Sequence, residues 1–158
     1  MEYYKKLFRS FVYAFRGVWG TIKSERNMRI HITCVAYMFS ILGFTDWFTL
    51  SRTDWAILVV ASGTVLAAEV INTAIENAVN LATEQYSKFA EISKDAAAGA
   101  VLVSAIFAVI TGVIIMYQPA AFSAMYNHFT ANPLQFALLA LSIIPATLFI
   151  FLPKRKKQ

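Results

Sequence analysis

The sequence predicts an all-helical integral membrane protein with an N-terminal amphipathic surface helix and four membrane spans. Of its 158 residues, 58% are hydrophobic and only 15% are charged, whereas a soluble domain has about 25% charged residues. The apolar residues gather in runs long enough to cross a bilayer. The basic residues flank these runs, so the net charge of +5 indicates topology and anionic lipid head groups rather than nucleic acid.

Residues 2–24 are predicted to form an amphipathic helix on the membrane surface. Apolar and aromatic side chains recur at helical spacing along one broad face, and lysines and arginines lie on or beside the other. This combination is typical of helices that lie in the plane of the membrane interface. A soluble helix packed on a partner is the alternative, which the apolar runs that follow disfavour.

Four later segments are predicted to cross the membrane. They cover about residues 30–50, 55–81, 96–117 and 134–152. A bilayer needs about 20 apolar residues, so the second segment is longer than required, and its last turns, with Glu76 and Asn80, are expected to project into the interface. Polar connections are expected at 82–95 and 118–133, and Pro145 is expected to kink the last span.

The positions of lysine and arginine orient this topology. Of the fourteen, all but Arg52 lie in the amino-terminal region, in the 82–95 connection or in the tail. Because cytoplasmic loops carry the excess of basic residues, both termini and the 82–95 connection are expected to face the cytoplasm. The basic run at 154–157 is expected to bind anionic lipid.

The segment 66–81 carries a polar stripe within an apolar helix. At about 100° per residue, one narrow face holds Glu69, Asn72, Thr73, Glu76 and Asn80. Ionisable groups are costly in a bilayer, so they normally face a bundle interior or a wet cavity and mark function. A structural stripe that joins helices by hydrogen bonds is the alternative, which two glutamates seven residues apart disfavour. This helix is the predicted active site.

Further polar groups are expected at the same membrane depth, near the cytoplasmic end of this helix. They are Glu25 with Arg29, and Lys94 with Asp95. Paired carboxylates near cations suit Mg²⁺ that shares phosphate oxygens, and Glu69 suits a general base toward a membrane-embedded hydroxyl. This set fits phosphoryl transfer. The sequence has no P-loop, dinucleotide-binding or protein-kinase motif, so the residues alone leave an ion-coupled transporter using Glu69 and Glu76 as an equal alternative.

Two segments resemble the signature of the prokaryotic diacylglycerol kinase family, which also contains undecaprenol kinases. They are AEVINTAIENAVN at 68–80 and KDAAAGAVL at 94–102, and the resemblance extends through FRGVWGTIKSERNMRIH over roughly residues 8–117. It implies a membrane lipid kinase domain at 1–117 with three family-core spans, followed within 118–158 by an outer loop, an extra fourth span and a basic tail. It also implies a bacterial cell membrane protein that works as a homotrimer with active sites shared between neighbouring subunits.

The resemblance implies catalytic and metal-binding roles for matched residues. Glu69 would be the base that activates the hydroxyl of a membrane lipid alcohol and would contact that lipid. Asn72 would help to position the hydroxyl or the γ-phosphate of ATP. Glu25 and Glu76 would hold the Mg²⁺ ions that bridge the nucleotide phosphates.

Contacts to the nucleotide and the lipid are implied in the same way. Lys94 would contact the phosphates, Asp95 would support the nucleotide end, and Arg9 on the surface helix would contact the lipid. A nucleotide-binding role is also implied for Asn80. The family usually has aspartate at this position, so this chain lacks one carboxylate near the nucleotide. His31, at the membrane boundary, is interpreted as interfacial rather than functional.

The sequence favours undecaprenol as the lipid alcohol. The segments SERNMRIH and AAGAVL resemble the undecaprenol-kinase branch of the family more than the diacylglycerol branch. Two alternatives stay open. One is the phosphorylation of diacylglycerol, and the other is a non-catalytic or ion-binding membrane protein.

Overall fold

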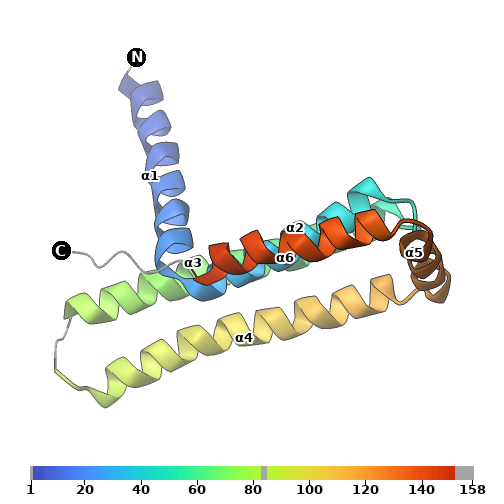
Figure 1. The fold of residues 1–158 in the computed structure, drawn as a ribbon. Helices are drawn as coiled ribbons and strands as arrows, with labels where there is room; N and C mark the ends of the chain where they lie inside the picture. Colours follow the sequence, from blue (N-terminus) through green and yellow to red (C-terminus); the bar gives the residue numbers. More distant parts are fainter. Residues whose placement is uncertain (1, 83–84, 152–158) are drawn as a thin grey trace.

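The computed structural model describes residues 2–82 and 85–151, and within these ranges the chain forms helices and no strand. The helices are α1 (Glu2–Ser24), α2 (Arg26–Phe44), α3 (Arg52–Ala82), α4 (Lys88–Met116), α5 (Pro119–Ala131) and α6 (Pro133–Phe151). Figure 1 shows α2, α3, α4 and α6 running lengthwise in one bundle, with α1 projecting from one end and α5 at the other. The predicted all-helical class and the helix at 2–24 are confirmed.

Three of the described helices are long and apolar enough to cross a membrane. These are α3, α4 and α6. At about 1.5 Å per residue, the 31 residues of α3 extend for about 46 Å, more than the roughly 30 Å hydrocarbon core. Large apolar side chains are exposed along α4 and α6, as is expected of surfaces that meet lipid or another subunit. The chain is a multi-pass membrane protein.

The first predicted span, at 30–50, differs from the helix observed there. Helix α2 ends at Phe44 and already includes Arg29 and His31 near its start. Its 19 residues cover about 28 Å. Because of these polar residues, α2 is not among the described helices that are apolar enough by composition to cross a membrane. It still packs against α3 and α6 within the bundle.

Both predicted polar connections are largely helical, which corrects the sequence interpretation. Helix α4 begins at Lys88, so the 82–95 connection is reduced to a short segment of which 85–87 are described. Helix α5 fills most of 118–133, with Pro119 at its start, where proline is favoured because the first turn needs no N–H partner. Pro145 lies inside α6, and the kink expected there stays a prediction. Residue 152 and the basic run at 154–157 lie outside the described residues.

The interior of the bundle centres on the contact between α3 and α4. The buried face of α3 carries apolar Leu58 and Val65 toward one end and polar Glu69, Asn72 and Thr73 toward the other. The facing residues of α4 include small ones such as Ala97, which is buried and allows two helices to approach closely. The polar stripe therefore faces a neighbouring helix and not the lipid.

Arg29 joins the ends of three helices. Its side chain is only 4% exposed. Nη1 donates to the carbonyls of Ile22 (2.9 Å) and Lys23 (3.1 Å) in the last turn of α1, and Nε donates to the carbonyl of Ile150 (3.0 Å) near the end of α6. Because the last carbonyls of a helix have no partner within that helix, one guanidinium caps α1 and α6 together.

Arg29→Met is therefore expected to destabilise the fold. Hydrogen bonds to charged groups contribute about 1.5–3 kcal/mol each, so the loss should be at least about 2 kcal/mol and should lower Tm in detergent micelles. Arg26→Met, at an exposed position in the same helix, is the matched control and should leave Tm close to that of the natural chain. Equal Tm values for the two variants would contradict the capping role.

Candidate functional site

Glu69 is the most deeply buried ionisable side chain among the described residues, with 1% of its surface exposed. Its Oε1 lies 3.4 Å from Nε2 of His31 on α2, yet it forms no hydrogen bond with any described residue. A buried polar atom without a hydrogen bond costs free energy. Such a cost is tolerated where the atom serves a substrate.

Asn72, one turn further along α3, also has a buried oxygen atom without a hydrogen bond to any described residue. Its Nδ2 donates to Oε1 of Glu76 at 3.0 Å, while its Oδ1 is buried and has no hydrogen-bond partner within the described chain. Residues four apart on a helix lie one above the other, so the donor of Asn72 orients the carboxylate of Glu76. One face of α3 thus presents two buried oxygen atoms and an oriented carboxylate.

A cavity of about 200 Å³ opens beside these groups. Its polar wall comes from α2 and α3, and its other wall comes from α4. The lining residues are Asn27, His31, Glu69, Asn72, Ala98, Val101, Leu102 and Ala105. A cavity with one polar and one apolar wall suits a hydroxyl group on an apolar chain.

Glu25 and Glu76 lie close enough to Glu69 for their charges to act on it. Glu25 precedes the first residue of α2 in an extended conformation. Within residues 2–82 and 85–151, no three His, Cys, Asp or Glu side chains are grouped as a ready-made metal site. Mg²⁺ is usually held by one or two carboxylates together with substrate phosphates, so carboxylates at Glu25 and Glu76 fit that ion, and their role stays a prediction.

A second, wider cavity of about 640 Å³ lies where α3 ends and α4 begins. Lys94 and Asp95 of α4 line it together with Asn80 of α3, and Nζ of Lys94 donates to Oδ1 of Asn80 at 2.7 Å. The Tyr86 hydroxyl also lines it and donates to Glu91 (2.6 Å), a bond that raises the pKa of Tyr86. The site is polar, open and next to Glu76 along α3.

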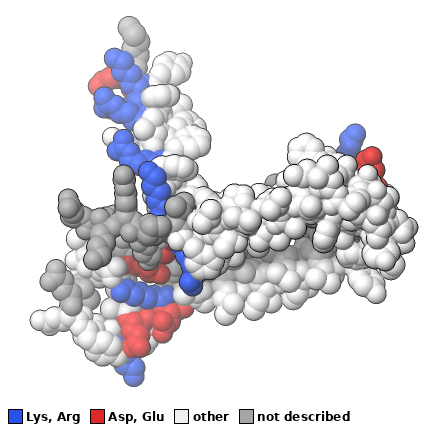
Figure 2. Space-filling view, viewed as in Figure 1, with Lys and Arg blue, Asp and Glu red and all other residues white. Residues whose placement is uncertain are grey.

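Charged side chains concentrate at this end of the bundle. Figure 2 shows lysine, arginine, aspartate and glutamate along α1 and at the adjoining end of the bundle where α3 and α4 meet, a largely uncharged middle, and a small charged patch at the far end. The two cavities therefore lie at the charged end of a membrane bundle, where a soluble phosphate donor and a membrane lipid can meet.

The predicted site residues are divided between the two cavities. Glu69 and Asn72 line the first, and Asn80, Lys94 and Asp95 line the second. Glu25 and Glu76 line neither cavity, although Glu76 accepts a hydrogen bond from Asn72.

Arg9 is exposed on α1, which projects from the bundle, and it lines neither cavity. His31, interpreted from the sequence as interfacial, instead lines the Glu69 cavity. Its partner on the cavity wall, Asn27, was also missed. Their spacing of four residues, which places both on one helix face, is the signal that could have found them.

Three comparisons with known proteins bear on this site. Residues 12–116 match the family described as prokaryotic diacylglycerol kinase. An undecaprenol kinase of Bacillus subtilis is 40% identical over 110 residues, which cover 70% of this chain and 87% of that protein. A diacylglycerol kinase of Synechocystis sp. is 40% identical over 112 residues, which cover 70% of this chain and 62% of that protein. No solved structure matches the chain.

The matched range contains both cavities described above and excludes the last two helices. Glu25, the stripe on α3 and the Lys94–Asp95 pair all lie within 12–116, whereas Arg9, α5 and α6 lie outside it.

Proposed function

The chain belongs to the prokaryotic diacylglycerol kinase family and is a membrane lipid kinase, and from this premise we propose that it transfers the γ-phosphate of ATP to undecaprenol. Transfer takes place at the cytoplasmic interface of a bacterial cell membrane, with both termini on the cytoplasmic side. The distribution of charge supports this orientation, because basic residues mark the cytoplasmic end and they gather at the end that carries both cavities.

The observation that carries the mechanism is the buried Oε1 of Glu69 without a hydrogen-bond partner. The lipid hydroxyl enters the cavity between α3 and α4, and its chain lies along the apolar wall of Val101 and Leu102. Glu69 accepts the hydroxyl proton as the oxygen attacks the γ-phosphorus. The new P–O bond forms as the bond to the leaving oxygen of ADP breaks. Asn72, whose Oδ1 is also free of hydrogen bonds within the described chain, positions the hydroxyl.

The nucleotide phosphates lie on the side of Glu76 and Lys94. Glu25 and Glu76 would hold Mg²⁺ there, and the ion would neutralise phosphate charge. Lys94 binds the phosphates as a point charge, and Asp95 supports the nucleotide end of the wider cavity. The position of Asn80 in the same cavity supports a nucleotide contact for this residue.

A homotrimer with shared sites belongs to the same proposal. Arg9 does not reach the Glu69 cavity of its own chain, and α1 projects away from the bundle with most of its surface exposed. In a homotrimer, α1 would lie along a neighbouring subunit, where Arg9 would contact the lipid at that subunit's site. The large exposed apolar surfaces of α4 offer room for the contact between subunits.

The choice of undecaprenol rests on the segments SERNMRIH and AAGAVL, which resemble the undecaprenol-kinase branch of the family more than the diacylglycerol branch. Identity to the two relatives is equal at 40% and does not distinguish the two acceptors. Diacylglycerol is the alternative acceptor.

The test is transfer of label from γ-labelled ATP with Mg²⁺ in mixed micelles, with undecaprenol and diacylglycerol offered in parallel. We expect labelled undecaprenyl phosphate to form faster than labelled phosphatidic acid. Label in phosphatidic acid alone would identify the other acceptor. No label in either lipid, with protein shown to be folded, would favour a non-catalytic or ion-binding protein.

Asn80→Asp is expected to change activity only modestly. Lys94 already bonds to residue 80, and the variant turns that exposed bond into an ion pair worth at most about 1 kcal/mol. The KM for ATP should therefore change by no more than about fivefold, as measured by initial rates against ATP concentration. A gain of several orders of magnitude in kcat would instead indicate that the natural chain is nearly inactive because it lacks this carboxylate.

A further inference from the structure

The buried carboxyl group of Glu69 takes up one proton in each phosphate transfer, and it must lose this proton before the next transfer. This requirement rests on the proposed function, in which Glu69 accepts the hydroxyl proton of the lipid. A protonated carboxyl group is a hydrogen-bond donor and cannot act again as the base. Only 2% of the Glu69 side chain is exposed, so water has little access to it. Turnover therefore needs a second group that carries the proton out.

His31 on α2 connects this carboxyl group to the surface. Its Nε2 lies 3.4 Å from Oε1 of Glu69, and 24% of its side chain is exposed. It is the one basic side chain within ion-pair distance of Glu69 among residues 2–82 and 85–151. An imidazole gains and loses protons near neutral pH, so histidine is a common proton shuttle.

The other elements around His31 provide no competing base. Helix α6, which packs on α2, contains no titratable residue. At the end of α1, the ammonium group of Lys23 lies over the ring of Trp19, and α1 forms no ion pair with His31 within the described chain. Glu25 acts on Glu69 through its charge. The residues of α4 that line the cavity carry no titratable group, and they are Ala98, Val101, Leu102 and Ala105.

His31 also lies toward the charged end of the bundle. It is in the second turn of α2, which begins at Arg26, and Asn27, one turn earlier, lines the same cavity. Arg29 of the same helix bonds instead to carbonyls of α1 and α6. Charged side chains gather at this end (Figure 2), where water is available. A proton on His31 thus has a short path past Asn27 to water.

We propose that His31 takes the hydroxyl proton from Glu69 after each phosphate transfer and releases it to water. The neutral ring carries its own proton on Nδ1, so Nε2 offers a lone pair to Glu69. The O–H bond at Oε1 breaks and an N–H bond forms at Nε2, which leaves a carboxylate and an imidazolium. The ring then turns toward its exposed side, and Nε2 gives the same proton to water. This restores the starting tautomer and releases one proton for each phosphate transferred.

The test compares the first turnover with the later ones in His31→Gln. Glu69 enters the first turnover without a proton, so this turnover should run at the natural rate. Glutamine cannot carry the proton away, so later turnovers should be at least about tenfold slower. Rapid mixing of the full chain in lipid–detergent micelles with γ-labelled ATP and Mg²⁺ should therefore show a burst of about one labelled lipid per site. A first turnover slowed as much as the later ones, or no slowing of either, would overturn the proposal.

His31→Ala provides a second readout and serves alone if His31→Gln does not fold. The missing ring leaves space for a small base, so imidazole added to the buffer should restore most of the lost steady-state rate. Pyrazole has a similar shape but is a much weaker base, and it should restore little. No response to imidazole, or equal rescue by the two compounds, would overturn the proposal.

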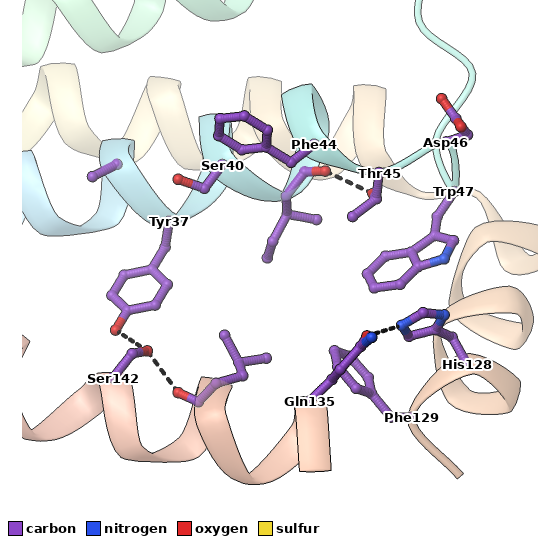
Figure 3. A pocket seen from close by; sticks show the side chains of 13 residues that line it. Tyr37, Ser40, Phe44, Thr45, Asp46, Trp47, His128, Phe129, Gln135 and Ser142 are labelled. Carbon is purple, nitrogen blue, oxygen red and sulfur yellow. Dashed lines mark hydrogen bonds between the residues drawn. The ribbon is translucent and has the colours of Figure 1, made fainter. Parts of the chain in front are cut away.

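His128 is the matched control, because the chain has only two histidines. It lies on α5 at the other end of the bundle and lines a cavity of about 730 Å³ between α2 and α6 (Figure 3). Its Nε2 lies 2.6 Å from Oε1 of Gln135. His128→Gln should show natural rates in the first and later turnovers and no response to imidazole.

The outcomes distinguish this proposal from the proposed function. Absence of labelled lipid with the natural chain would count against the proposed function itself. If Glu69→Gln lost phosphate transfer while His31→Gln kept the natural steady-state rate, the result would count against the role of His31 alone.

Discussion

Glu69→Gln is expected to lower the rate of phosphate transfer by about 10²–10⁴-fold, the range that a positioned general base contributes. The amide has nearly the same shape as the carboxylate but cannot accept the hydroxyl proton. Because Oε1 lies buried without a hydrogen bond within the described chain, removing its charge relieves a desolvation cost. The variant should therefore stay folded, with a Tm equal to or above that of the natural chain.

The matched control for this change is Asp54→Asn. Asp54 is a carboxylate in the first turn of the same helix, and it is partly exposed and accepts hydrogen bonds from Ser51. Its loss should leave kcat almost unchanged. Initial rates of both variants, together with size-exclusion profiles in detergent, separate chemistry from folding. If Glu69→Gln retained the natural rate, Glu69 would not be the base.

Glu76→Gln is expected to raise the half-saturating Mg²⁺ concentration for phosphate transfer about 100-fold or more. Groups that merely support a metal ligand change metal affinity by about 10–100-fold, so a direct ligand should have at least this effect. The amide oxygen of glutamine can still accept the bond that Asn72 donates at 3.0 Å. The local geometry is thus kept while the charge is lost.

Rates measured against Mg²⁺ concentration at fixed ATP check this expectation. Activity of Glu76→Gln should recover in part at high Mg²⁺, and Glu25→Gln should shift the curve in the same direction. If both carboxylates bind one ion, the double variant should lose less than the sum of the two effects. Glu2→Gln, an exposed position on α1, should not move the curve. An unchanged curve in Glu76→Gln would exclude this carboxylate as a ligand.

The polar stripe on α3 is the part of the site that the sequence predicts best. Helical periodicity alone places Glu69, Asn72 and Thr73 on one face, and the structure buries that face against α4. The cost of an ionised group in lipid makes the inward direction predictable too. The spacing of these residues and the high cost of placing a carboxylate in lipid are enough to predict the shared face and its inward direction.

Helix boundaries and connections were predicted less well. The segment 118–133 forms α5 although its polar residues favour a loop, and α4 begins at Lys88, well before the apolar run at 96. Hydropathy indicates which residues tolerate lipid. Backbone hydrogen bonding, however, can continue a helix through polar residues that lie outside the lipid. Capping signals such as Pro119 at a helix start carry this information only locally.

The sequence by itself determined the class of the protein, the inward face of α3 and the resemblance to a lipid kinase family, because these depend on spacing within one segment and on residue type. Tertiary structure decided the approach of His31 to Glu69, the joining of α1 and α6 through Arg29, and the cavity between α2 and α6. These are contacts between residues far apart in the chain. Their geometry depends on how whole helices pack, and no single segment encodes it.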